Sequence, residues 1–209
     1  MAAAYYERYG AELDDKPLDR AMLAGFAELV RTAGAGPVAD IGCGTGRVTA
    51  LLDGLGLSAF GIDLSPRMVA VARRLYPALR FEVGSMLDLD LPDGALGGIL
   101  AWYSTIHIPE ERLPEVFAEF FRVLAPGGYL QLGFQASDEP AHLAQALGHE
   151  VSLDFQPRQP EPVARLLGVA GFVMRARMLR EPDEEGEFTE RTQQAFLLAR
   201  KPPVAPDVT

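Results

Sequence analysis

The sequence predicts an α/β fold in which a mostly parallel β-sheet carries helices on both faces. From Pro37 onward, short apolar runs alternate with amphipathic stretches, which is the pattern of strands joined by crossover helices. Near the C-terminus, two apolar runs follow one another with only the acidic stretch 181–187 between them. Strands joined by such a loop are expected to be antiparallel, so one margin of the sheet should depart from the parallel arrangement.

The expected elements follow in chain order. Residues 1–35 read as helical, and strands are expected at 37–41, 58–62, 79–83, 96–102, 128–134, 172–180 and 193–200. Helices are expected at 45–55, 66–75 and 110–124. Ser65 and Pro66 predict the start of the second of these helices, because serine caps a helix and proline fits its first position.

The chain is long enough to bury one core without disulfides, so we expect a single domain over residues 1–201. The helical segment 1–35 and an insertion at 137–160, with one possible strand at 149–156, are candidates for a lid. Such a lid would cover the carboxyl ends of the strands, where ligands bind in parallel sheets. The proline-rich residues 202–209 are expected to form a flexible tail.

Composition excludes several classes of function. The chain has 29 acidic and 19 basic residues and a net charge of −10, which disfavours a nucleic-acid partner. It shows neither a long apolar run nor a signal peptide, so we expect a cytoplasmic protein without membrane association. The single cysteine rules out an internal disulfide, and the acids at 88, 90 and 93 alternate with leucines as in a solvated loop. No metal site is therefore expected.

The segment from Asp40 to Gly46 follows one strand and precedes a helix. Its glycines, at 42, 44 and 46, allow a sharp turn and leave no side chain between the backbone and a ligand. Asp63 ends the next strand, about where a carboxylate meets the ribose hydroxyls of a bound nucleoside. Asp40, on the strand side, can orient the loop and accept a hydrogen bond from an ammonium group.

Two other glycine-loop motifs fit less well. A dinucleotide site needs a third glycine where this chain has Arg47, and a nucleotide hydrolase needs a Gly-Lys-Ser or Gly-Lys-Thr sequence that the chain lacks. Cys43 is small and polarizable, and we interpret it as a packing residue within the loop and not as a nucleophile.

The segments ADIGCGTGRVT, FGIDLSPRMVAVAR, FEVGSMLDLDLP, GILAWYSTIH and RVLAPGGYLQL resemble, in order and spacing, the successive motifs of class I methyltransferases. The resemblance covers residues 37–135 and continues more weakly to the C-terminus. It implies a Rossmann-like sheet of seven strands in the order 3-2-1-4-5-7-6, with strand 7 antiparallel. It also implies that S-adenosyl-L-methionine is the cofactor and S-adenosyl-L-homocysteine the product.

The same resemblance implies a cofactor site. Its methionine part would contact the loop, at Asp40, Gly42, Cys43, Gly44 and Gly46. Asp63 would bind the ribose, and Leu64 and Met68 would flank the adenine, whose edge would meet Gly84, Ser85 and Met86. Serine stands at position 85 where the family often has an acid, but a hydroxyl also accepts a hydrogen bond. Ala101 and Trp102, with Tyr103, would line the floor beside the sulfonium.

Methyl transfer from a sulfonium needs mainly alignment and exclusion of water, so a catalytic base is optional. If one is used, His107 is the first candidate and Tyr103 the second, because both follow the fourth strand; a capping or packing role for His107 is the alternative. Tyr5, Tyr6, Tyr9, Lys16 and Arg20 are candidates for binding the methionine carboxylate, and Tyr9 is our choice.

The acceptor is expected to be a small molecule with an oxygen or nitrogen nucleophile, and the protein a monomer or homodimer. No Pro-Pro-aromatic sequence follows the fourth strand, so the resemblance does not extend to enzymes that methylate adenine or glutamine amino groups. A catalytically silent binder of S-adenosylmethionine is the alternative, and a hydride-transferring dehydrogenase a third possibility.

Overall fold

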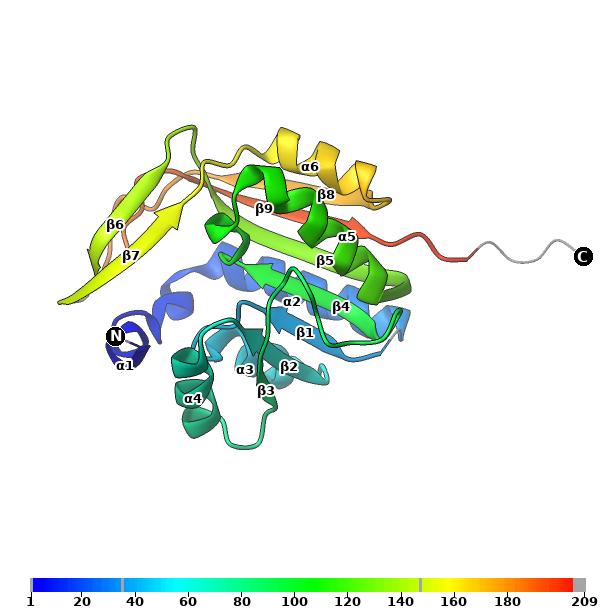
Figure 1. Ribbon diagram of the computed structural model, residues 1–209, viewed down its shortest axis with the longest axis horizontal. Helices are drawn as coiled ribbons and strands as arrows, with labels where there is room; N and C mark the ends of the chain where they lie inside the picture. Colours follow the sequence, from blue (N-terminus) through cyan, green and yellow to red (C-terminus); the bar gives the residue numbers. More distant parts are fainter. Residues whose placement is uncertain (1, 35, 147, 205–209) are drawn as a thin grey trace, which may run out of the picture.

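The computed structural model describes residues 2–34, 36–146 and 148–204. The strands of its main sheet are β1 (Val38–Ile41), β2 (Ala59–Asp63), β3 (Phe81–Val83), β4 (Leu96–Trp102), β5 (Leu124–Ala136), β8 (Val173–Arg180) and β9 (Gln193–Arg200). Their order is β3-β2-β1-β4-β5-β9-β8, and β9 runs antiparallel to both of its neighbours (Figure 1). This confirms the topology expected from the sequence, with β8 and β9 as the sixth and seventh strands.

The helical elements are α1 (Ala2–Tyr9), η1 (Glu12–Asp15), α2 (Pro17–Ala33), α3 (Arg47–Gly54), α4 (Pro66–Leu75), η2 (Thr105–His107), η3 (Glu110–Arg112), α5 (Leu113–Val123) and α6 (Pro160–Val169). Ser65 caps α4 as expected, since its Oγ accepts a hydrogen bond of 3.3 Å from the Met68 amide. The helix expected over 110–124 begins as the 3-10 turn η3. It becomes α-helical at Leu113, with Pro114 in the first turn, where a missing N–H costs no hydrogen bond.

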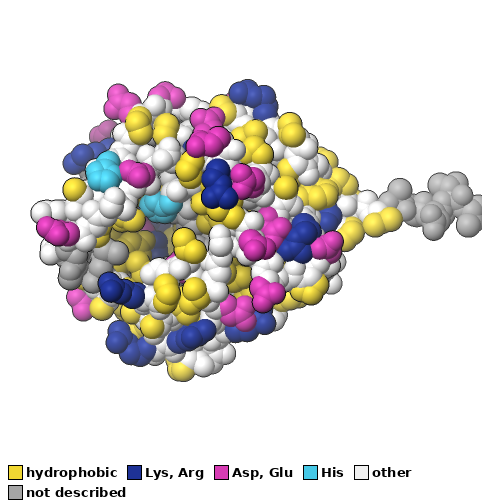
Figure 2. Space-filling model, viewed as in Figure 1, with side chains coloured by type: hydrophobic (Ala, Val, Ile, Leu, Met, Phe, Trp, Pro, Cys, Tyr) yellow, Lys and Arg dark blue, Asp and Glu magenta, His cyan; other side chains and the backbone are white. Residues whose placement is uncertain are grey.

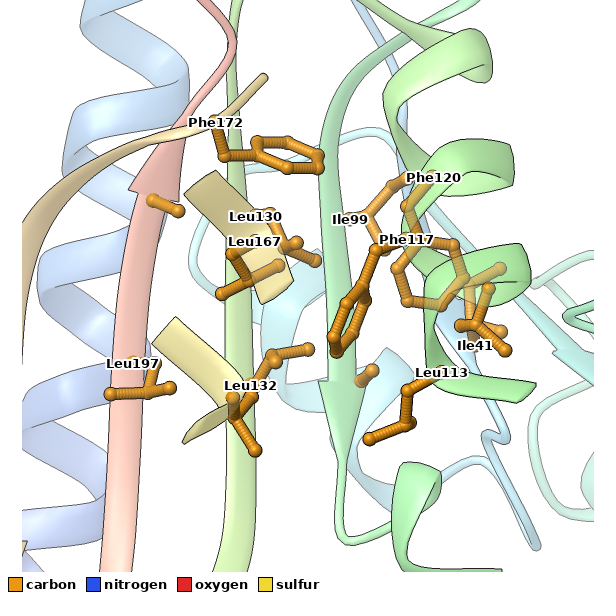
Figure 3. Close-up of a cluster of buried hydrophobic side chains, with 14 of the residues drawn as sticks. Ile41, Ile99, Leu113, Phe117, Phe120, Leu130, Leu132, Leu167, Phe172 and Leu197 are labelled. Atoms are coloured by element: carbon orange, nitrogen blue, oxygen red, sulfur yellow. The ribbon is translucent and has the colours of Figure 1, made fainter. Parts of the chain in front are cut away.

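Two apolar layers cover the faces of the sheet. Figure 3 shows Phe117 and Phe120 of α5 packed near Ile99 of β4, in a cluster that also takes in Leu167 of α6. On the opposite face, Phe26 and other residues of α2 pack with α3 against alternate positions of the strands. Strand β4 is buried along its whole length, because its side chains alternate between the two layers.

The sequence analysis did not identify one strand within the insertion and one helix that follows it. Strand β6 (Ala141–Ala146) pairs with β7 (His149–Phe155) in a separate two-stranded sheet, and α6 follows it. Only β7 was expected, as the possible strand at 149–156. The hairpin projects beyond the carboxyl ends of the parallel strands, on the same side of the molecule as α1 (Figure 1).

Within the described residues, the helices are too short or too polar for any of them to span a bilayer. Figure 2 shows acidic and basic side chains interspersed over one face of the molecule. Of the expected tail, residues 205–209 lie outside the described part of the chain.

Candidate functional site

The glycine loop leaves β1 at the carboxyl edge of the sheet and is fixed there by backbone hydrogen bonds. The amides of Gly42 and Cys43 both donate to the Ile62 carbonyl of β2, at 2.7 and 3.1 Å. The loop therefore lies across the ends of β1 and β2, beside the point between β1 and β4 where the strand order reverses. Ligands bind at this position in open α/β folds.

The three glycines serve different purposes, although all have positive φ angles. A Cβ on Gly42 would lie 2.2 Å from Cβ of Ser104, so this glycine lets the loop pack against the segment after β4. A Cβ on Gly46 would lie 2.6 Å from the Phe81 ring. A Cβ on Gly44 would meet nothing within 4 Å. Gly44 is thus the glycine whose missing side chain opens onto free space, as a ligand-binding position requires.

Asp63 connects the glycine loop to the end of β2. Its Oδ2 accepts a hydrogen bond from the Gly44 amide and its Oδ1 one from the Ser65 amide, each at 2.8 Å. A carboxylate oxygen has two lone pairs, so each oxygen keeps one for a further donor. Two adjacent hydroxyl groups, such as those of a ribose, fit this remaining capacity.

An uncovered apolar surface adjoins Asp63. The Leu64 side chain is 73% exposed, and Val83 at the end of β3 is 51% exposed. Met68, Gly84, Ser85 and Met86 are half-buried around them. An aromatic base lying against Leu64 would remove this surface from water. The open Gly44, the free lone pairs of Asp63 and the exposed Leu64 together fit a nucleoside with a short polar chain.

Two residues that were expected to contact the cofactor form hydrogen bonds within the protein. The Ser85 hydroxyl accepts a hydrogen bond of 3.2 Å from the Leu87 amide, which leaves one lone pair for an adenine amino group. The Asp40 carboxylate is fully buried and accepts a hydrogen bond of 2.7 Å from the Thr49 hydroxyl of α3. Burial raises the pKa of Asp40 to about 7. In this arrangement Asp40 orients the loop from beneath.

Cys43 lies in a small cluster with Phe81 and is buried. Burial is the main cause that raises the pKa of its thiol, and the nearby charges of Asp40 and Asp63 raise this pKa further. A thiol that stays protonated is a poor nucleophile. This environment agrees with the packing role expected for Cys43.

Of the three expected floor residues, only Tyr103 is partly exposed. Ala101 and Trp102 are buried in different clusters, and the Trp102 ring stacks on Phe196 with centroids 5.1 Å apart. Tyr103 has a positive φ of 53°, a strained conformation for a residue with a side chain. Burial raises the pKa of Tyr103 well above its usual value, so its hydroxyl stays protonated. The structure therefore suits Tyr103 to donating a hydrogen bond and not to accepting a proton.

His107 lies exposed in η2, just beyond β4, and contacts the hairpin. Its Nδ1 is 3.0 Å from the carbonyl oxygen of Asp154, and its ring meets the Phe155 ring edge-on with centroids 5.0 Å apart. A carbonyl oxygen can only accept, so in the neutral imidazole the proton is on Nδ1. Nε2 then carries the free lone pair that a general base needs.

The N-terminal segment crosses the site above the glycine loop. Arg47 at the start of α3 donates to the Tyr9 carbonyl at 3.0 Å and pairs with Glu12 at 2.6 Å. Burial raises the pKa of Tyr5, and Arg47 and Asp63 are among the charges that act on it. The centroids of the Tyr5 and Tyr9 rings lie 4.9 Å apart, and the Tyr9 ring packs between Tyr5 and Phe188. Sequence spacing alone did not separate these two tyrosines.

A buried ionic cluster joins the N-terminal segment to the loop between β8 and β9. Lys16 pairs with Asp183 at 2.6 Å and Glu190 at 3.2 Å. Arg180 donates to both oxygens of Glu190 at 2.7 Å and pairs with Asp19 at 3.1 Å. The sequence analysis missed this cluster, because its members lie more than 160 positions apart. Lys16, considered there as a ligand for the methionine carboxylate, already has these partners.

No group of three potential metal ligands lies close enough to hold an ion within the described ranges.

Similarities to known proteins agree with the fold and with this site. Residues 38–128 match the family described as "Methyltransferase domain". The chain is 32% identical to an O-methyltransferase of Penicillium expansum over 144 residues, which are 65% of this chain and 51% of that protein. It is 33% identical to an uncharacterized methyltransferase of Mycobacterium bovis over 138 residues, 62% of this chain and 54% of that protein.

Among solved structures, an S-adenosylmethionine-dependent methyltransferase from Methanosarcina mazei has the same fold, with a TM-score of 0.70 and 18% identity. The match covers 80% of this chain and 92% of that one. The chain spans about half the length of the first two curated relatives. The matched domain, the sheet order and the glycine loop with its acidic partner lead to one conclusion. Residues 38–128 form a methyltransferase domain, within a chain that has the fold of S-adenosylmethionine-dependent methyltransferases.

Proposed function

We propose that the protein transfers a methyl group from S-adenosylmethionine to an oxygen or nitrogen of a small-molecule acceptor. The observation that carries this proposal is Asp63, which holds the open Gly44 in place and keeps a lone pair on each oxygen for the ribose hydroxyls. The similarity to an O-methyltransferase supports the reaction type. The uniform mixture of charges on the visible face supports a small acceptor over a nucleic acid.

Different residues of the site would bind different parts of the cofactor. Gly44 would admit the methionine chain, Asp63 would bind the ribose, and Leu64 would cover the adenine with Met68, Gly84, Ser85 and Met86 around its edge. Tyr5, whose ring packs against that of Tyr9, stays with Tyr9 a candidate for binding the methionine end. The segment 2–15 would act as a lid, because it reaches to Arg47 and, through Arg8, to Glu187 in the β8–β9 loop.

When bound, S-adenosylmethionine supplies a methyl group activated by the positive sulfur and leaves as S-adenosylhomocysteine. His107 would accept the acceptor's proton on Nε2, because its Nδ1–H is held by the Asp154 carbonyl. Tyr103 would orient the acceptor as a hydrogen-bond donor. The closed lid would exclude water from the site.

Two measurements test the proposal. Isothermal titration calorimetry should detect binding of S-adenosylhomocysteine and no comparable binding of nicotinamide dinucleotides. A screen with labelled cofactor, a metabolite extract and mass detection should find a methylated product that the Asp63→Asn variant does not form. Binding without any product would favour a catalytically silent protein, and binding of the dinucleotides alone would favour a dehydrogenase.

A further inference from the structure

The hairpin formed by β6 and β7 has one apolar and one polar face. In its register, Ala141 pairs with Phe155 and Leu143 pairs with Leu153, so these four side chains share a face. His142 and Asp154 form the pair on the opposite face, and His142 Nδ1 lies 2.7 Å from an oxygen of Asp154. The hairpin is therefore amphipathic.

The apolar face begins at the candidate catalytic residue. Phe155 packs against His107 and against the central core cluster. The Gln156 amide donates to the Ile106 carbonyl at 2.8 Å, which fixes the base of the hairpin to η2. Side chains alternate along a strand, so Leu153 and Val151 continue on the face to which Phe155 belongs.

This face is only partly covered by the protein. The hairpin forms a separate two-stranded sheet. On its apolar face, Leu143 is 41% exposed, and Val151 and Leu153 are half-buried. Glu150, Ser152 and Asp154 on the other face of β7 are exposed. Figure 2 shows the surface hollowed between the hairpin and the N-terminal helix. An uncovered apolar surface that starts at a reactive side chain suits a ligand better than water.

Two basic side chains that join the N-terminal segment to the end of β8 and the loop after it are already paired. Lys16 and Arg180 are buried in contact with Asp183, Glu190 and Asp19, so an ionic acceptor would have to break existing pairs to gain a partner there. A neutral acceptor would leave these pairs intact.

We propose that the apolar face of the β6–β7 hairpin, at Leu143, Val151, Leu153 and Phe155, binds the apolar body of a neutral methyl acceptor. The inference rests on the proposed methyltransferase function and names its substrate class. The acceptor carries its nucleophile next to His107 and extends an alkyl or aryl group along the hairpin. Affinity is then set by the length of the apolar group, and reactivity by the nucleophile.

A series of 4-alkylphenols with methyl, butyl and octyl substituents probes this directly. Calorimetry in the presence of S-adenosylhomocysteine should show affinity rising about threefold or more for each two added methylenes. Leu153→Gln and Val151→Gln should remove most of this dependence and weaken binding of 4-octylphenol by about tenfold. Ser152→Gln places the same side chain on the polar face of the same strand and should leave the series unchanged.

The outcomes separate this inference from the function on which it rests. Failure of S-adenosylhomocysteine to bind at all would overturn the proposed function. If it binds while phenol affinity does not depend on chain length, or if Ser152→Gln has the same effect as Leu153→Gln, the hairpin assignment is wrong. Light scattering could instead show a dimer that Leu153→Gln dissociates, while phenol affinity does not depend on chain length. That result would overturn the hairpin assignment and show that a second copy of the protein covers the apolar face. Circular dichroism checks that each variant is folded.

Discussion

Asp63 has a structural role and, in the proposed function, also a binding role. Its two oxygens hold the amides of Gly44 and Ser65 and still have lone pairs free. Replacing the carboxylate by alanine would remove the ribose contact and release the loop at the same time. Asparagine is the more informative change, since it keeps the shape and one accepting oxygen but loses the charge and the second acceptor.

We expect Asp63→Asn to weaken S-adenosylhomocysteine binding by about ten- to a hundredfold, because a hydrogen bond to a charged group is worth about 1.5–3 kcal/mol. Isothermal titration calorimetry measures the change. Asp53→Asn, at an exposed position of α3, serves as the control and should bind as the wild type does. Equal affinities for wild type and Asp63→Asn would refute the ribose assignment.

His107 has a defined tautomer because Asp154 offers a carbonyl oxygen to Nδ1. If Nε2 is the general base, His107→Asn should lower kcat by about a hundredfold while the affinity for S-adenosylhomocysteine stays nearly constant.

His142→Asn is the matched control for His107, since His142 contacts the side chain of the same Asp154 from the outer face of the hairpin. Its kcat should equal that of the wild type in a methylation assay with an identified acceptor. A His107→Asn variant that keeps most of its turnover would show that alignment alone carries the reaction.

Asp40 should make the stability of the protein depend on pH. Burial raises its pKa from 3.8 to about 7, while its bond to Thr49 acts in the opposite direction. A raised pKa means that the folded state holds the proton more tightly than the unfolded state. The contribution to stability is therefore full below about 4, the pKa of an unfolded aspartate, and is lost as the pH rises through about 7.

Thermal unfolding without ligand should accordingly show a higher Tm for Asp40→Asn than for the wild type at pH 8, and a flatter pH profile from about pH 4 to 7. Asparagine can still accept the Thr49 hydrogen bond through its amide oxygen. Asp19, whose pKa burial raises to about 6, acts in the same direction and should leave part of the slope. Superimposable profiles for wild type and Asp40→Asn would contradict this assignment.

At the level of the secondary-structure elements, the ionic cluster fastens η1 and α2 to the end of β8 and the loop after it. Arg180 is 7% exposed and contacts three carboxylates, those of Asp19, Asp183 and Glu190. Removing one member of a buried ion pair leaves the other charge uncompensated, which costs more than losing an exposed pair.

Arg180→Leu should therefore lower the free energy of unfolding by about 3–5 kcal/mol. Arg177→Leu changes an arginine of the same strand that is 49% exposed and lies 3.8 Å from Glu161, and should cost less than about 1 kcal/mol. Urea denaturation of both variants measures the difference. Similar midpoints for the two variants would show that the cluster contributes little to stability.

The hairpin was less predictable than the strands of the main sheet. Every residue of strand β6 except Leu143 is small or polar, and a register shift after Leu143 interrupts its alternation. Its pairing partner β7 has a clearer pattern of alternate apolar residues. A short strand with weak alternation is recognised only through the strand beside it.

At the level of the whole molecule, the sequence by itself determined the strands of the main sheet and the glycine turn after β1. The strands of a parallel sheet are buried on both faces and read as apolar runs, and the glycines and Asp63 lie at fixed spacing after β1 and β2. These signals are local, so the N-cap of α4 and the antiparallel pairing of β8 and β9 could also be predicted. The order of the strands came from the resemblance of the successive motifs to class I methyltransferases.

Only the tertiary structure decided how the lid is held and where each candidate side chain points. Asp40 lies beneath the loop and accepts a hydrogen bond from Thr49, and Lys16 forms ion pairs with Asp183 and Glu190. His107 contacts the hairpin at the Asp154 carbonyl. Each of these contacts depends on the packing of segments that are separate in the chain, and composition and periodicity describe only neighbours along it. The position of a long polar side chain follows from partners that arrive with the rest of the fold.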